Sequence, residues 1–286
     1  NILALLSEVL KDCGVGGEEK VAKLCYLALT SRVCERPVSL AVKGPSSSGK
    51  SYVTSQVLRF LPNSAYHALT AMSDKALMFS DEELVHRFLV LIEAEGLKSD
   101  MASYLVRSLL SEGRISYETV ISTTTEGPRS LLIEKEGPTG LLVTTTAANL
   151  HPENETRLLS VTVQDTKEQT KAILRSLATD ETSEVDLSDW IGFQEWLGTA
   201  EHRVVILFAK AIADLSNPAG VRFRRDFGSL LTLIKTHAIL HQLNRQRDED
   251  GRIIANLDDY LMVHALVADI ISEGLGQAVS KTVRET

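Results

Sequence analysis

The sequence predicts an α/β fold in which a parallel sheet is flanked by helices and followed by a helical subdomain. Uninterrupted apolar runs at Phe88–Ile92 and Leu141–Thr145 are typical of strands buried on both faces, as in a parallel sheet covered by helices. After Trp190 the apolar residues recur at helical spacing instead, which predicts a mostly helical second half. We therefore expect an α/β portion up to residue 178 and a helical portion after it.

The individual elements are predicted from local patterns along the chain. Residues 1–36 read as a helical lead-in of two helices, separated by a break at Gly14–Gly17. Ile115–Ile121 and Leu131–Glu134 flank a Thr/Gly/Pro-rich turn and predict a hairpin. The further strands are predicted at Ser39–Val42 and Leu158–Val163. The further helices are predicted at Tyr52–Phe60, Met101–Leu110, Val204–Leu215, Asp226–Leu243 and Leu257–Glu273.

The composition excludes several classes of protein. The chain has 286 residues, 44% hydrophobic and 24% charged, which argues against a disordered or repetitive chain. No apolar run approaches the roughly 18–20 residues of a membrane span, and no leader is recognisable, so we expect a cytoplasmic protein without a membrane partner. The formal charge of −8 gives no general attraction for phosphate backbones. Contact with DNA therefore requires a local basic feature.

Cysteine and histidine patterns give no sign of a zinc or disulfide framework. Cys13, Cys25 and Cys34 are odd in number and lack CxxC spacing, which favours a reducing compartment. His237 and His241 lie four apart on a predicted helix, without the glutamate of an H-E-x-x-H site. We expect these two histidines to be a packed pair.

One segment carries a complete nucleotide-binding motif. Gly44, Pro45, Ser46, Ser47, Ser48, Gly49, Lys50 and Ser51 fit the pattern G-x-x-x-x-G-K-[ST], between a predicted strand and a predicted helix. The two glycines let the chain wrap closely around a phosphate, towards which the backbone N–H groups point. We expect all eight residues to bind ATP, with Lys50 on the β- and γ-phosphates and Ser51 as a ligand of Mg²⁺.

A carboxylate follows the buried strand at Phe88–Ile92, where such a fold presents its metal or water ligand. The common pair at this point is Asp-Glu, but here Ile92 precedes Glu93. In the register that we favour, Glu93 is the catalytic glutamate and the usual metal-side aspartate is missing. In the other register Glu93 is the metal ligand and Ala94 replaces the base, which puts hydrolysis in doubt.

These motifs together resemble those of AAA+ ATPases, and within them the minichromosome maintenance (MCM) clade of replicative helicases. Leu141–Thr146 is similar to the sensor 1 strand of that family, with Thr146 at the polar sensor position. Glu155-Thr156-Arg157-Leu158-Leu159 resembles the family's Ser-Arg-Phe-Asp segment, which implies that Arg157 is an arginine finger. Arg225-Asp226-Phe227 looks like the start of the lid helix, which implies that Arg225 is the sensor 2 arginine.

The resemblance implies a domain organisation and an assembly. It divides the chain into an AAA+ core at 37–178, with a pre-sensor 1 hairpin, and a lid at 179–286. It implies ATP hydrolysis with Mg²⁺ at the subunit interfaces of a homo-oligomer, a hexameric ring. In that ring Lys50 and Ser51 act in their own subunit and Arg157 is donated by the neighbour.

The function implied in this way is that of a DNA helicase or translocase in phage or mobile-element replication. The hairpin touches DNA in helicases of this clade, but here it is not notably basic: Arg129 and Lys135 are accompanied by Glu126, Glu134 and Glu136. That departure and the missing aspartate favour an alternative, an ATP-driven regulator or assembly factor that binds protein and lacks helicase activity. A small-molecule kinase is the third reading, and the helical lid and the distant arginines weaken it.

Overall fold

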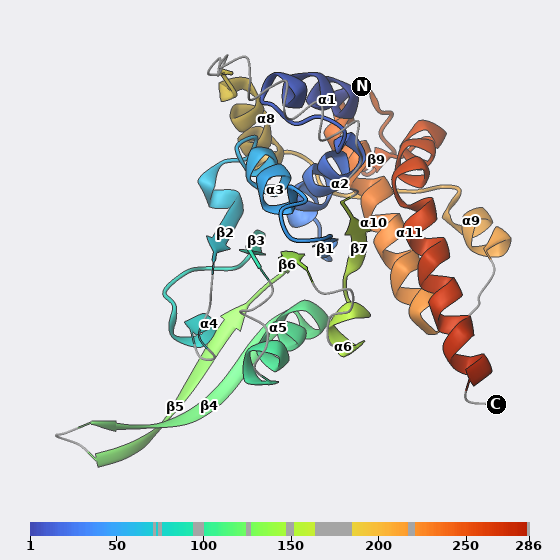
Figure 1. Cartoon of the computed structure of the whole chain (residues 1–286). Helices are drawn as coiled ribbons and strands as arrows, with labels where there is room; N and C mark the ends of the chain where they lie inside the picture. Colours follow the sequence, from blue (N-terminus) through green and yellow to red (C-terminus); the bar gives the residue numbers. More distant parts are fainter. Residues whose placement is uncertain are drawn as a thin grey trace.

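A five-stranded parallel sheet forms the centre of the molecule (Figure 1). The computed structural model describes residues 1–70, 73, 76–93, 100–123, 127–146, 152–163, 185–216 and 221–284. The strands of the sheet are β1 (Leu40–Lys43), β2 (Tyr66–Leu69), β3 (Arg87–Leu91), β6 (Thr139–Thr145) and β7 (Leu159–Thr162). Their order is β2-β3-β6-β1-β7, so that β6 pairs in parallel with both β1 and β3. The predicted α/β fold with a parallel sheet is confirmed.

Two apolar cores cover the two faces of this sheet. Leu40 and Val42 of β1 belong to the larger core, whereas Ala41 between them belongs to the smaller one, as the two-residue period of a strand requires. The helices that contribute to the larger core are α1 (Ile2–Asp12), α2 (Glu19–Thr30), α3 (Lys50–Leu58), α8 (Ser188–Thr199), α10 (Val221–Leu240) and α11 (Leu257–Arg284). The helices of the smaller core are α4 (Ala76–Phe79) and α5 (Asp100–Glu112). Helices therefore flank the sheet on both sides.

The predicted hairpin is present and is longer than its sequence pattern indicated. Strands β4 (Arg114–Thr123) and β5 (Gly127–Glu136) pair antiparallel from Arg114↔Glu136 to Thr123↔Gly127. The hairpin leaves the amino end of β6 and projects away from the sheet and the helices (Figure 1). Among the side chains of the hairpin that the structure describes, those near its base are anchored in the smaller core, where Ile115 is buried and Tyr117 and Ile133 are partly buried. Most of its length is therefore available for contacts with other molecules.

The C-terminal half is mostly helical, as predicted, but two helices begin elsewhere than expected. Helix α10 begins at Val221, five residues before Asp226, so Arg225 lies in its second turn and does not open it. The helix predicted from Val204 begins only at α9 (Ala209–Leu215), because Val204–Val205 forms strand β8, which pairs in parallel with β9 (Ile253–Ile254). The β-branched valines favour that pairing once Ile253 and Ile254 supply a partner strand. The remaining short elements are α6 (Pro152–Glu155) and the 3₁₀ turns Ser31–Val33, Asn63–Ala65 and Gln242–Asn244.

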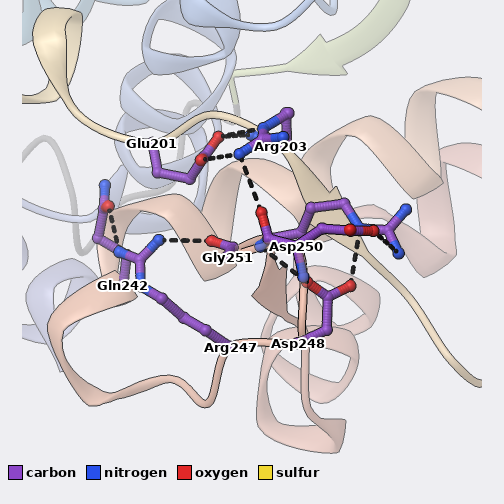
Figure 2. A network of polar contacts seen from close by, with 8 residues as sticks. Glu201, Arg203, Gln242, Arg247, Asp248, Asp250 and Gly251 are labelled. Carbon is purple, nitrogen blue, oxygen red and sulfur yellow. Dashed lines mark hydrogen bonds and ion pairs between the residues drawn. The ribbon is translucent and has the colours of Figure 1, made fainter.

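A network of polar contacts fixes the turn that leads into β9 (Figure 2). The Asp248 carboxylate accepts hydrogen bonds from the backbone N–H groups of Asp250 and Arg252, at 3.1 and 2.8 Å. Arg203, which precedes β8, binds the carboxylate of Glu201 through two nitrogens and also donates to the Asp250 carbonyl oxygen, at 3.2 Å. Arg252 also pairs with the carboxylates of Asp248 and Asp250, at 2.7 and 3.2 Å, so both carboxylates are engaged within the turn.

A second polar cluster joins α10 and α11 to the N-terminal helix. Nδ1 of His237 lies 2.6 Å from a carboxylate oxygen of Asp259, and Arg245 donates to both oxygens of that carboxylate, at 3.0 and 2.7 Å. The His241 ring stacks on His237 with centroids 4.3 Å apart, and its Nε2 accepts from the backbone N–H of Ile2 at 3.2 Å. The histidines form the packed pair that was expected.

The predicted division into lead-in, core and lid stays a prediction. Helices α1 and α2 pack into the same core as β1 and α10. The boundary between residues 178 and 179 lies outside the described residues. Among the helices that the structure describes, none has the length and the apolar character needed to cross a membrane.

The burial of His241 predicts a stability that depends on pH. Burial lowers the pKa of His241 from an ordinary value of 6.5 to about 4. Between pH 6.5 and 4 the unfolded chain therefore binds a proton that the folded chain does not, and the free energy of unfolding falls as the pH falls. Between pH 7 and pH 4.5 we expect the melting temperature of His241→Gln to fall less than that of the wild type.

The matched control is His264→Gln, because His264 is exposed on α11. This control should lose as much melting temperature as the wild type over the same interval. Equal losses in the wild type and both variants would show that His241 does not carry the pH dependence.

Candidate nucleotide-binding site

The segment Gly44–Ser51 connects the carboxyl end of β1 to the start of α3, as the motif predicted. Gly49 has a φ of +85°, a left-handed conformation that glycine adopts without steric cost. At Gly44 a Cβ atom would lie 2.8 Å from Ser48 Oγ and 3.2 Å from the Val163 carbonyl oxygen, which is too close. A side chain at Gly44 would displace its neighbours and one at Gly49 would strain the backbone, so the conformation of the loop favours glycine at both positions.

The interior of this loop is suited to an anion. Lys50 is 7% exposed, and its ammonium group donates to the carbonyl oxygen of Pro45 in the same loop. Burial lowers the pKa of Lys50, while the nearby charge of Glu93 raises it. The Ser48 hydroxyl is buried without a hydrogen-bond partner in the described part of the chain. A phosphate group would supply a partner to this hydroxyl and to the ammonium group, so the residues present fit a nucleotide.

The strand order brings Glu93 and Thr146 to the same edge of the sheet as the loop. Glu93 follows β3 and Thr146 follows β6, and both residues are exposed. Lys43 pairs with Thr145, so Thr146 lies opposite Gly44 at the start of the loop. Lys50 and Ser51 of the first turn of α3 complete the set. Ser51 stays a predicted Mg²⁺ ligand, and Glu93 stays the predicted catalytic glutamate or, in the other register, a second ligand of Mg²⁺; both lie at this edge.

Thr144 is a site residue that the sequence analysis missed. It is fully buried in β6, and its hydroxyl accepts a hydrogen bond of 2.9 Å from the backbone N–H of Glu93. Glu93 has a φ of +75°, a conformation that L-residues other than Asn and Asp adopt rarely. This hydrogen bond therefore helps to stabilise an unfavourable backbone conformation at Glu93. The polar run Thr144–Thr146 was the available signal, but the partner depends on the pairing of β3 with β6.

The two predicted arginines lie at the opposite edge of the sheet. Arg157 lies in the turn before β7, and the register of β7 on β1 pairs Leu159 with Leu40, so the backbone of Arg157 lies beyond the amino end of β1. From Leu40 to Gly44 the chain spans roughly 13 Å at about 3.3 Å per residue. The structure therefore separates Arg157 from the phosphate loop of its own chain.

Arg157 and Arg225 are brought together by the chain segment between α6 and β7. Arg157 donates to the Ser111 hydroxyl at 2.6 Å and to the Glu153 carbonyl oxygen, and Arg225 donates to the Thr156 hydroxyl at 2.7 Å. Burial and the neighbouring positive charge of Arg225 lower the pKa of Arg157. Both arginines line a cavity of about 580 Å³. Two guanidinium groups at one cavity are suited to bind an anion that comes from outside the chain.

The sheet, the phosphate loop and the carboxylate beside it define a P-loop NTPase. Residues 1–189 match the MTBMA_p00010 P-loop domain family, and the chain belongs to that family. A search of curated proteins found no match. The match covers the whole of the α/β portion that contains the site.

The hydrogen bond between Thr144 and Glu93 predicts a specific kinetic defect. Thr144→Val keeps the shape of the side chain but removes the acceptor of the Glu93 N–H group, so the backbone conformation of Glu93 loses a stabilising contact. We expect ATP affinity to stay near that of the wild type while the hydrolysis rate falls roughly tenfold to a hundredfold. ATP binding by fluorescence titration and steady-state hydrolysis measure the two effects.

Two further variants calibrate this experiment. Thr144→Ser keeps the hydroxyl and should hydrolyse ATP at close to the wild-type rate. Glu93→Gln should bind ATP and hydrolyse it far more slowly than Thr144→Val. A wild-type hydrolysis rate in Thr144→Val would mean that this bond does not position Glu93.

Proposed function

We propose that the protein is an AAA+ ATP-driven motor similar to the MCM clade, which acts on DNA as a helicase or translocase during phage or mobile-element replication. The observation that carries the proposal is the separation of Arg157 and Arg225 from the phosphate loop of the same chain. A complete site then requires a second copy of the chain, because charge on the γ-phosphate must be neutralised in the transition state. Contacts of this head-to-tail kind generate a ring if the rotation closes, and we propose a hexamer.

In the proposed mechanism the residues of one subunit bind ATP and those of the next complete the site. The loop Gly44–Ser51 holds the phosphates, with Lys50 on the β- and γ-phosphates. Ser51 and Glu93 would hold Mg²⁺, which supplies positive charge between the phosphate oxygens when it is bound. Glu93 also orients the attacking water, and Thr146 provides a polar contact at the same edge. Arg157, with Arg225 beside it, comes from the neighbouring subunit.

The hairpin β4–β5 is the proposed contact with DNA. It projects from the body of the chain, as a segment that enters the channel of a ring must do (Figure 1). Its described strands carry equal numbers of basic and acidic residues, namely Arg114, Arg129 and Lys135 with Glu118, Glu134 and Glu136. Lys135 is bound to the carbonyl oxygens of Ser80 and Glu82. We therefore propose that the hairpin makes a small contact with DNA, to which electrostatic attraction contributes little.

The same hairpin favours the second candidate, an assembly factor that binds protein. Val120 and Leu132 are 67% and 57% exposed. The register pairs Val120 with Ser130 and Glu118 with Leu132, so both apolar side chains lie on one face of the hairpin. An exposed apolar pair on a hairpin without net charge is suited to bind the surface of another protein, and this alternative is therefore retained.

The proposed sharing of sites predicts complementation between two inactive variants. Lys50→Ala should not bind ATP, and Arg157→Ala should bind ATP but hydrolyse it roughly 10³–10⁵-fold more slowly, since that is the contribution of an arginine finger. In a ring assembled randomly from equal amounts of both, about one interface in four combines an intact loop with an intact finger. We expect the mixture to recover part of the ATPase activity.

Arg203→Ala is the matched arginine control, because Arg203 is a surface residue paired with Glu201. Its ATPase rate should equal that of the wild type. A mixture that stays inactive, although mass measurements show that the two variants assemble together, would mean that Arg157 does not act in trans.

Stimulation by DNA separates the motor from the assembly factor. We expect single-stranded or double-stranded DNA to raise the ATPase rate several-fold, and Arg129→Ala to reduce this stimulation while leaving the basal rate unchanged. The measurement is the ATPase rate with and without each DNA, alongside the solution mass with ATP. A nucleotide-dependent ring whose ATPase ignores both forms of DNA would favour the assembly factor.

A further inference from the structure

A buried ion pair links the phosphate loop to the segment that carries Arg157. Lys43 is the last residue of β1, directly before Gly44, and its ammonium group contacts the carboxylate of Glu155 in α6. The two side chains are only 11% and 16% exposed. Charges removed from water to this extent are held in place, since separating them would cost their mutual attraction while both stay largely out of water.

The Glu155 end of this pair is joined to both arginines through a single turn of the chain. Glu155 ends α6, and two residues later the backbone N–H of Arg157 donates to the Asn154 carbonyl oxygen at 3.0 Å. Thr156, between them, accepts the hydrogen bond from Arg225. A displacement of Glu155 must therefore change the positions of Thr156 and Arg157.

The Lys43 end is next to a loop whose contacts must change when nucleotide binds. The Pro45 carbonyl oxygen accepts from the Lys50 ammonium group and from the Ser48 N–H, the latter at 3.4 Å. A bound phosphate would compete with this oxygen for the Lys50 ammonium group, so binding would change the contacts of the loop. In the chain, only Gly44 separates Lys43 from Pro45, whose carbonyl oxygen makes these contacts.

We propose that the Lys43–Glu155 pair couples occupancy of the phosphate loop to the position of Arg157 in the same subunit. A subunit that holds ATP then presents its arginine to the next site in the ring better than an empty subunit does. Lys43 and Glu155 are positioning residues in this scheme, because neither has to touch the nucleotide. The proposal rests on the function proposed above, in which Arg157 completes the neighbour's site.

The test uses mixed rings in which hydrolysis is possible only at the phosphate loops of Arg157→Ala subunits. The other subunits of the ring supply an intact Arg157 and are called donors, and two kinds of donor are compared. One donor is Lys50→Ala, which stays empty, and the other is Glu93→Gln, which holds ATP without hydrolysing it appreciably. Each donor is mixed with Arg157→Ala subunits at saturating ATP, and the ATPase rate is divided by the amount of mixed ring. We expect the loaded donor to support a rate roughly fivefold higher than the empty donor, which is the low end of typical allosteric coupling.

Variants of the ion pair identify the source of that difference. Glu155→Gln in both donors should bring the two rates together, because the amide cannot hold the Lys43 ammonium group as an ion pair. Glu153→Gln is the matched control: Glu153 lies on the same helix but pairs with Arg107 of α5, at 2.8 Å, and should leave the fivefold difference intact. If Glu155→Gln disturbs folding, the exchanged pair Lys43→Glu with Glu155→Lys should restore both the fold and the difference.

The outcomes distinguish this proposal from the one on which it rests. If neither donor restores hydrolysis in co-assembled rings, Arg157 does not act in trans and the proposed function fails. If both donors restore hydrolysis equally, the shared site stands and the coupling is wrong. If the fivefold difference survives Glu155→Gln, occupancy is transmitted by a route other than the Lys43–Glu155 pair.

Discussion

The position of β6 between β1 and β3 is the constraint on which the rest of the molecule depends. Parallel pairing of β6 with both neighbours aligns the carboxyl ends of three strands at one edge, and the phosphate loop, Thr146 and Glu93 each follow one of them. The same pairing places the starts of β6 and β7 at the other edge, from which the hairpin and Arg157 extend. If β6 lay elsewhere in the sheet, the groups beside the phosphate loop would no longer lie together, and neither would those beside Arg157.

The edge of the sheet that carries the phosphate loop lacks the common Asp-Glu pair after β3, and the structure partly explains this difference. Ile92 occupies the place where an aspartate usually precedes the glutamate. Glu93 turns out of the strand in a left-handed conformation, which costs roughly 1–3 kcal/mol and persists only where other contacts hold it. The Thr144 hydroxyl supplies one such contact. The backbone conformation of Glu93 thus depends in part on the neighbouring strand.

The two edges are joined by polar groups, whereas the sheet between them is filled with apolar side chains. Lys43 and Glu155 place a paired charge beside the smaller core, and α6 is held on α5 by the Arg107–Glu153 pair and by the bond from Asn154 to Ser103, at 3.1 Å. Paired and hydrogen-bonded charges in such surroundings are specific in geometry, because each alternative arrangement leaves a charge unsatisfied. At the Lys43–Glu155 pair, which is much less exposed than Glu153, specific geometry of this kind is what transmission between two sites requires.

The sequence by itself determined the features that depend on neighbouring residues. The phosphate loop needs its glycines, lysine and serine at fixed spacing, and the buried strands at Phe88–Ile92 and Leu141–Thr145 need only a continuous apolar run, so both were predictable. The hairpin and most C-terminal helices followed from local periodicity in the same way, and the coarse α/β class followed from their order.

The tertiary structure alone decided what depends on residues far apart in the chain. Glu93 and Thr144 are 51 positions apart, and Lys43 and Glu155 are 112 apart, so neither contact leaves a local pattern. Val204–Val205 became a strand because Ile253–Ile254 lies beside it, although the segment has helical spacing. The separation of Arg157 from its own loop was visible only once the register of β7 on β1 was known. Local spacing identifies chemical groups, but the pairing of strands decides which of them can meet.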